Sequence, residues 1–132
     1  MTATNLMCGD WVMFEKISFQ ETPEYLNGQV SKIDSELDVI YIKGKSCCYL
    51  EQQIKPIPLT QEILEKNGFV RVEKSEFNQF GSWNLEKYAC SVRELRTTLF
   101  DTIICGYPRV IQYVHELQHV LKFCKIDKEI VL

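Results

Sequence analysis

The sequence predicts an α+β protein in which β structure predominates: a small closed β-barrel over residues 1–58, followed by an α+β unit over residues 59–132. Short runs of β-forming residues separated by turn signals predict the barrel. Helical patterns appear only after residue 60. The chain has 132 residues, of which 45% are hydrophobic and 25% charged, values typical of one globular domain or two very small ones. We therefore expect the two units to pack as one compact globule.

The first unit is expected to contain five short strands and one helical turn. The strands are predicted at residues 11–14, 29–33, 39–43, 47–49 and 54–57, with the helical turn at 50–53. Asn27-Gly28 is a strong turn signal between the first two strands. Pro56 and Pro58 fit an edge strand and its exit, because proline donates no ladder hydrogen bond. Closing the sheet would remove its exposed edges, which favours a barrel.

The second unit is expected to begin with a short helix and to end with a long one. Thr60 is a good N-cap for a helix over 61–66, and Asn67-Gly68 supplies its left-handed end. Strands are predicted at 69–74, 88–92 and 97–105, with a loop at 75–86. An amphipathic helix is predicted from Arg109 to Cys124, and residues 129–132 could add a last strand.

Charge and targeting signals narrow the classes of partner. Fifteen basic and eighteen acidic residues give a formal net charge of −3, and neither half of the chain is basic, so nucleic-acid binding is not favoured. The N-terminus lacks the pattern of a signal peptide, and no stretch approaches the roughly 20 apolar residues that span a bilayer. We expect a cytoplasmic protein of the bacterial host, with no membrane partner and reduced cysteines.

Three phrases in this order resemble a group of small uncharacterised proteins carried by phages and mobile elements of gut anaerobes. They are the opening at 6–12 (Leu-Met-Cys-Gly-Asp-Trp-Val), the centre at 54–69 (Ile-Lys-Pro-Ile-Pro-Leu-Thr, then Ile-Leu, then Asn-Gly-Phe) and the close at 111–118 (Ile-Gln-Tyr-Val-His-Glu-Leu-Gln). The resemblance implies a phage or prophage origin and a cytosolic setting. It implies no particular activity.

The spacing of glycine and valine near the N-terminus resembles SH3-like barrels of translation and chromatin factors. Gly9-Asp10 precedes Val12 by one residue, and Gly28 is followed by Val30 and Ile33. Such barrels bind proteins, peptides or RNA and rarely catalyse reactions. This resemblance implies a binding module, an inference that rests on fold-level analogy.

Residues 115–119 (His-Glu-Leu-Gln-His) match the H-E-x-x-H signature of zinc metallopeptidases. In such enzymes both histidines face a shielded cleft and the glutamate polarises a metal-bound water. Here an apolar stripe at 110, 114, 117, 121 and 124 would place His115 and His119 on the opposite, exposed side of the helix. The only carboxylate side chains after His119 are those of Asp127 and Glu129, so a third zinc ligand is hard to find. We therefore predict no metal, no cofactor and no enzymatic activity, and a zinc hydrolase is the least favoured alternative.

The leading hypothesis is a protein-interaction module that binds a protein partner or a second copy of itself. Alternation in the first strand places Val12 and Phe14 inside and Trp11 and Met13 outside. The third strand has the same excess of apolar side chains, with Tyr41 outside. Trp11, Met13 and Tyr41 are therefore the predicted partner-binding residues. For this surface the favoured expectation is that the C-terminal helix packs there as part of an ordinary core, and the partner or self-association surface is the functional alternative.

A second hypothesis is a small-ligand protein that binds or sequesters a nucleotide and so counters host defence. It would be an oligomer whose pockets lie at subunit boundaries. Arg93, Arg96 and Arg109 would clamp the phosphate, because guanidinium groups make bidentate hydrogen bonds to phosphate oxygens.

Overall fold

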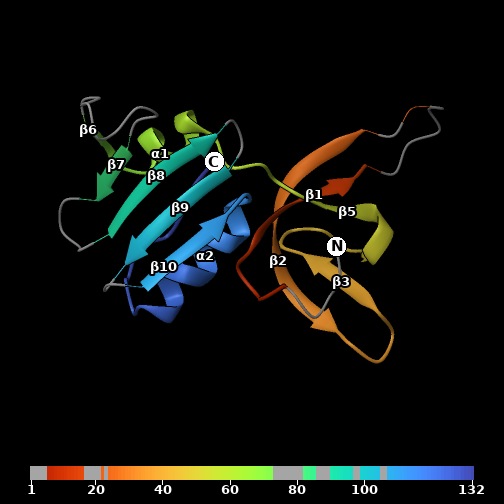
Figure 1. Cartoon of the computed structure of the whole chain (residues 1–132). Helices are drawn as coiled ribbons and strands as arrows, with labels where there is room; N and C mark the ends of the chain where they lie inside the picture. The colour runs from red at the N-terminus through yellow and green to blue at the C-terminus, as the bar shows by residue number, and fades with distance from the viewer. Residues whose placement is uncertain are drawn as a thin grey trace. The chain divides into compact units, whose positions relative to one another are not determined.

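The protein forms two compact units, Met1–Ile57 and Pro58–Leu132, each built around its own antiparallel sheet (Figure 1). The computed structural model describes residues 6–16, 22, 24–72, 82–85, 90–96, 99–104 and 107–132. Strands predominate over helices among them, so the predicted α+β class with mainly β structure is confirmed. The expectation that the units pack as one globule remains a prediction.

The first unit is an open five-stranded sheet with the order β4-β3-β2-β1-β5. Its elements are β1 (Trp11–Glu15), β2 (Tyr25–Asp34), β3 (Val39–Ile42), β4 (Cys48–Leu50), the 3₁₀ turn η2 (Glu51–Gln53) and β5 (Ile54–Pro56). The predicted closed barrel is wrong, because the sheet does not close. The two edge strands have three residues each, and Pro56 in β5 has no N–H to donate across a closing seam.

A single buried cluster fills the inner face of this sheet. It contains Leu6, Val12, Phe14, Val30, Ile40, Ile42, Tyr49 and Ile54. The turn expected at Asn27-Gly28 is also wrong, because β2 runs through both residues and pairs them with Met13 and Val12. A Cβ at Gly28 would lie 2.6 Å from Ile42 Cγ2 and 2.8 Å from a ring carbon of Phe14. The glycine is therefore required for close packing within a strand.

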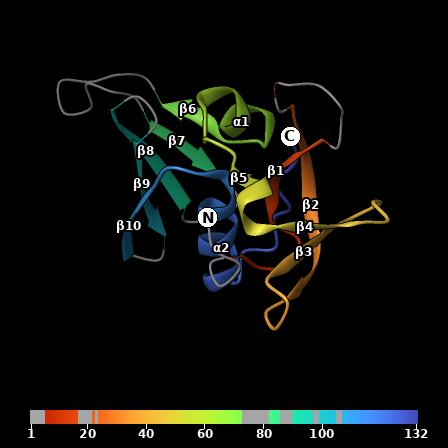
Figure 2. The ribbon, with the colours of Figure 1, turned by 90° about the vertical axis from the view of Figure 1, so that its right-hand side faces the viewer.

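The second unit is a five-stranded sheet with the order β10-β9-β8-β7-β6 and two helices on one side (Figures 1 and 2). Its elements are α1 (Gln61–Lys66), β6 (Val70–Val72), β7 (Ser82–Leu85), β8 (Cys90–Arg96), β9 (Leu99–Ile104), β10 (Tyr107–Ile111) and α2 (Val114–Phe123). Trp83 and Phe100 meet edge to face in its core, with ring centroids 6.2 Å apart.

At the start of the second unit, the structure agrees with the helix ends that the sequence predicts for α1. The Thr60 hydroxyl accepts a hydrogen bond from the Ile63 amide, as an N-cap does. Gly68 adopts a φ of 86°, and the Phe69 amide returns to the Leu64 carbonyl at 3.1 Å. The predicted cap and left-handed end of α1 are therefore both confirmed.

Two elements of the second unit differ from the prediction. Strand β7 lies inside the predicted loop, because a strand of four residues around Trp83 is too short for its period to stand out. Residues 107–111 form β10 rather than the first turn of the long helix, which begins at Val114. Proline is tolerated in an edge strand, so Pro108 does not prevent this pairing. No strand forms at residues 129–132.

Among the described residues, no helix is long and apolar enough to cross a membrane.

Candidate functional site

The face of the first sheet that points away from its core carries aromatic and basic side chains. We call it the outward face and define it by Trp11, Met13, Tyr25, Lys32, Tyr41 and Lys55. None of these residues is buried, whereas neighbouring strand positions such as Val12 and Ile42 belong to the core. The alternation of β1 produces this division, and in β3 Tyr41 is half-buried between the buried residues Ile40 and Ile42.

The three predicted partner-binding residues lie on this face and are half-buried. Trp11 and Met13 are next-but-one neighbours on β1. Tyr41 lies on β3, which is separated from β1 by β2. Complete burial of Trp11 would have contradicted the interface hypothesis, and its partial exposure is compatible with it.

The pairing register connects these residues into one surface. Trp11 lies opposite Gln29, and the Lys43 amide donates to the Gln29 carbonyl at 2.9 Å. After the irregularity between Val30 and Lys32, Tyr41 pairs with Lys32. Neighbouring strands lie about 4.8 Å apart, so side chains in adjacent rows contact each other. Strand β2 thus lies between Trp11 and Tyr41, which occupy different rows of the same face, opposite Gln29 and Lys32 respectively.

Sequence reasoning missed Tyr25, Lys32 and Lys55. The Lys55 ammonium lies 4.4 Å from the centroid of the Tyr25 ring, and the Lys32 ammonium lies 5.3 Å from that of Tyr41. Tyr25 was missed because Asn27-Gly28 was interpreted as a turn. Had the strand been continued through Gly28, alternation would have assigned Tyr25 to the face that carries Trp11.

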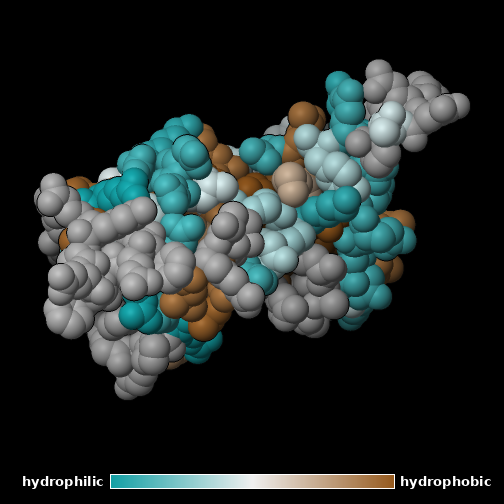
Figure 3. Space-filling view, turned by 45° about the horizontal axis from the view of Figure 1, so that its top comes forward, coloured by the Kyte–Doolittle hydropathy of each residue, from teal (hydrophilic) through white to brown (hydrophobic). Residues whose placement is uncertain are grey.

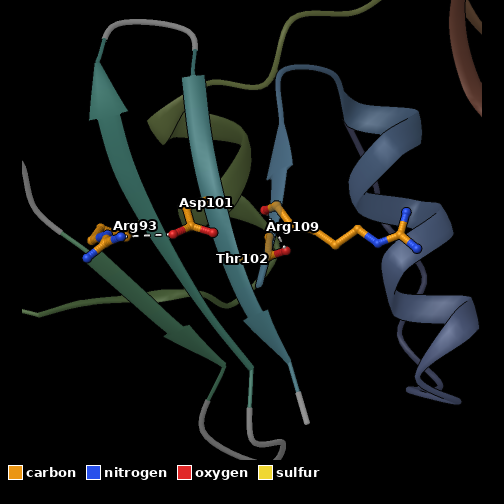
Figure 4. A network of polar contacts seen from close by, with 4 residues as sticks. All are labelled: Arg93, Asp101, Thr102 and Arg109. Atoms are coloured by element: carbon orange, nitrogen blue, oxygen red, sulfur yellow. Dashed lines mark hydrogen bonds and ion pairs between the residues drawn. The ribbon is translucent and has the colours of Figure 1, made fainter. Parts of the chain in front are cut away.

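The arginines proposed to bind phosphate do not converge. Arg93 pairs in register with Asp101, whereas Arg109 pairs with Thr102. Adjacent residues of a strand point to opposite faces, so Arg93 and Arg109 lie on opposite faces of the second sheet (Figure 4). Arg93 is bonded to Asp101, and the Arg109 guanidinium lies 5.9 Å from the Phe123 ring centroid on α2. Arg96 lies in β8, but its side chain is outside the described residues.

The predicted exposure of the two histidines is wrong, because His115 is 7% exposed and His119 is half-buried. The apolar stripe predicted for the C-terminal helix begins at Val110, but that residue belongs to β10 and is 58% exposed. Counted from Val114, the first helical residue, His115 lies about 100° around the axis, at the border of the buried side. The Tyr113 ring stacks on it with centroids 5.9 Å apart, and His119 meets it edge to face at 5.5 Å.

Glu116, the glutamate of the H-E-x-x-H pattern, caps its own helix. One carboxylate oxygen accepts hydrogen bonds from the Gln112 and Tyr113 amides, each at 3.1 Å. This is the reciprocal bond of a capping box. The pattern therefore has a structural explanation in the helix terminus. Within the described ranges, no group of three or more His, Cys, Asp or Glu side chains is placed to hold a metal ion.

The exposed surface mixes polar and apolar residues. Among the coloured residues in Figure 3, hydrophobic side chains reach the surface at several separate places between hydrophilic ones.

Comparisons with protein-family models, curated proteins and solved structures found no match to this chain.

Proposed function

We propose that this chain is a non-enzymatic interaction module that binds a protein partner through the outward face of its first unit. The observation that supports this most directly is that Trp11, Met13 and Tyr41 share one face and are only partly buried. With the phage resemblance, this makes it an accessory protein of a phage or mobile element that acts in the bacterial cytoplasm.

These residue types suit binding for physical reasons. Tryptophan and tyrosine supply large contact areas and lose little conformational entropy, and they are enriched among interface residues that dominate affinity. Methionine adapts its shape to a partner surface. A side chain that is already half-buried has lost part of its rotamer freedom, so less entropy is lost on binding.

Site-specific photo-crosslinking tests this proposal. A benzophenone amino acid is placed at Met13, and in a control protein at Leu37, which is 68% exposed in the turn between β2 and β3. Both proteins are irradiated in lysate of a gut anaerobe. We expect a crosslinked product at Met13 that is absent at Leu37, and competition by unlabelled wild type but not by Trp11→Ala. Equal labelling at both positions, or equal competition by Trp11→Ala, would contradict the proposal.

A second copy of the chain is the other occupant of this face that the sequence suggested. Mass spectrometry of the crosslinked product separates the two cases, because a self-association product contains only peptides of this chain. Either product supports a protein-binding face if it depends on Trp11.

A further inference from the structure

We infer that the partner segment that contacts the outward face is acidic, an inference that rests on the function proposed above. The face combines apolar contact area with ammonium groups held beside the aromatic rings. A polypeptide with carboxylates between apolar side chains is complementary to both.

The charges of the first unit are segregated. Residues 1–60 contain five lysines or arginines and eight acidic residues, so this half of the chain is negative as a whole. Two of the five, Lys32 and Lys55, nevertheless lie on the outward face, in the rows of Tyr41 and Met13. Lys43 directly follows β3, and its amide bonds to the Gln29 carbonyl in the row of Trp11. The centre of the face thus carries lysines on a unit that is acidic as a whole.

The acidic residues of this unit lie elsewhere or at the ends of the strands. Asp10 is buried and accepts a hydrogen bond from the Met7 amide. Asp34, at the end of β2, accepts bonds from the Glu36 and Leu37 amides and so caps the turn. Glu15, the last residue of β1, lies on the outward face opposite Tyr25, at the end of the strand. No described carboxylate lies in the rows that contain Trp11, Met13 or Tyr41.

The lysine and tyrosine geometry prepares the face for carboxylates. An ammonium held 4.4 Å from the Tyr25 centroid, or 5.3 Å from that of Tyr41, remains exposed and keeps all three donors available. A carboxylate placed above it gains a charge-assisted hydrogen bond. Positive charge around an aromatic centre also accelerates encounter with an acidic partner and sets its specificity.

Single-stranded nucleic acid is the other polyanion that combines charge with flat apolar groups. Its bases bind by stacking on the faces of exposed aromatic rings. Here lysine ammonium groups already lie against the Tyr25 and Tyr41 rings, on which bases would have to stack. The observations therefore favour an acidic polypeptide.

Fluorescence anisotropy on the full chain tests the inference with three labelled probes. The first is a 12-residue peptide of glutamate, leucine, serine and glycine, the second has lysine in place of each glutamate, and the third is an oligouridylate of equal length (all ~12 units, long enough to cross a five-stranded sheet). We expect saturable binding of the acidic peptide only. The affinity should fall at least about tenfold when salt rises from 50 to 500 mM, as for exposed charges.

Matched charge variants locate the binding. The double variant Lys32→Gln/Lys55→Gln should weaken binding of the acidic peptide at least about fivefold. The control Lys16→Gln/Lys45→Gln makes the same charge change away from the face, since Lys16 pairs with Glu24 and Lys45 lies over Phe14. It should bind like wild type. Circular dichroism verifies that both variants remain folded.

Each other outcome overturns the inference. Equal loss in the two double variants, equal binding of the basic peptide, or no binding of the acidic peptide would refute an acidic partner. Preferential binding of oligouridylate would assign the face to nucleic acid. A Trp11-dependent crosslink at Met13 that is insensitive to salt and to Lys32→Gln/Lys55→Gln would retain the proposed function while removing the acidic specificity. Loss of the crosslink itself would remove the function.

Discussion

The Arg93 guanidinium donates a hydrogen bond to Asp101 Oδ2 at 2.9 Å across strands β8 and β9. The arginine side chain is about half exposed, whereas Asp101 is buried. The second carboxylate oxygen, Oδ1, is also buried and has no hydrogen-bond partner among the described residues. The ion pair therefore compensates a carboxylate in the middle of a sheet.

Arg93→Ala should lower the free energy of unfolding by about 1–2 kcal/mol, because it leaves this carboxylate buried without its cation. The exposure of Arg93 keeps the cost below that of a fully buried pair. Urea unfolding provides the measurement. In the background of Asp101→Ala, Arg93→Ala should cost almost nothing, and equal costs in both backgrounds would show that the pair does not stabilise the sheet.

Gly28→Ala should destabilise the first unit by about 1–3 kcal/mol, because the new methyl group would overlap Ile42 and Phe14. Phe14→Leu should reduce this penalty when the two changes are combined. Gly44→Ala is the contrasting control, since its φ is 81° and no atom lies within 4 Å of the new Cβ. Its cost arises from backbone strain, so Phe14→Leu should not relieve it. Thermal unfolding of Phe14→Leu, of the two glycine variants and of the two double variants distinguishes crowding from strain.

Tyr49 should ionise at a higher pH than an ordinary tyrosine does. Burial in the core, and then the hydrogen bond between the Tyr49 hydroxyl and Cys47 Sγ at 3.4 Å, raise its pKa from 10.0 to about 12. The unfolded chain therefore loses this proton first, so the contribution to stability is complete below pH 10 and disappears as pH rises through about 12. Absorbance titration at 295 nm should show a late transition that Tyr49→Phe removes. Cys47→Ala should retain most of the shift, because burial is its largest cause; complete loss would contradict this order.

The Asn67 side chain hydrogen-bonds both to α1 and to the C-terminal tail. Its amide nitrogen donates to the Ile63 and Val131 carbonyls at 2.7 and 2.8 Å, and its oxygen accepts from the Val131 amide at 2.7 Å. Asn67→Ala should cost about 1–3 kcal/mol and abolish the hydrogen-exchange protection of the Val131 amide. Asn84→Ala, on an exposed strand position, should change neither. Retained protection in Asn67→Ala would mean that other contacts hold the tail.

The two histidines of α2 should differ in their effect on stability. His119→Ala should change the free energy of unfolding by no more than about 0.5 kcal/mol. His115→Ala should cost about 1–3 kcal/mol, because it removes a buried ring stacked on Tyr113. Leu117→Ala, at a fully buried position, should cost roughly 2–5 kcal/mol. Equal costs for the two histidine variants, measured by urea unfolding, would contradict the burial of His115.

Local signals in the sequence were sufficient for most elements of the first unit and for α1. The β-branched run at 39–42 and the Thr60 cap act through the backbone of a few adjacent residues, so their effect is visible without tertiary contacts. The same holds for the division of β1 into Val12 and Trp11 faces. Three of the six residues of the outward face, Trp11, Met13 and Tyr41, follow directly from alternation along their own strands.

Only the tertiary structure decided the remaining features, because they depend on residues far apart in the chain. The local sequence around Gly28 predicts a turn. In the folded chain the glycine is instead required within a strand, because Phe14 and Ile42 occupy the space that a side chain would need. The helical pattern from residue 109 is valid locally, but pairing with β9 converts 107–111 into a strand. The pairing of β8 and β10 with β9 also places Arg93 and Arg109 on opposite faces of the second sheet. Local propensities amount to less than about 1 kcal/mol per residue, so long-range packing and ladder pairing override them wherever the two conflict.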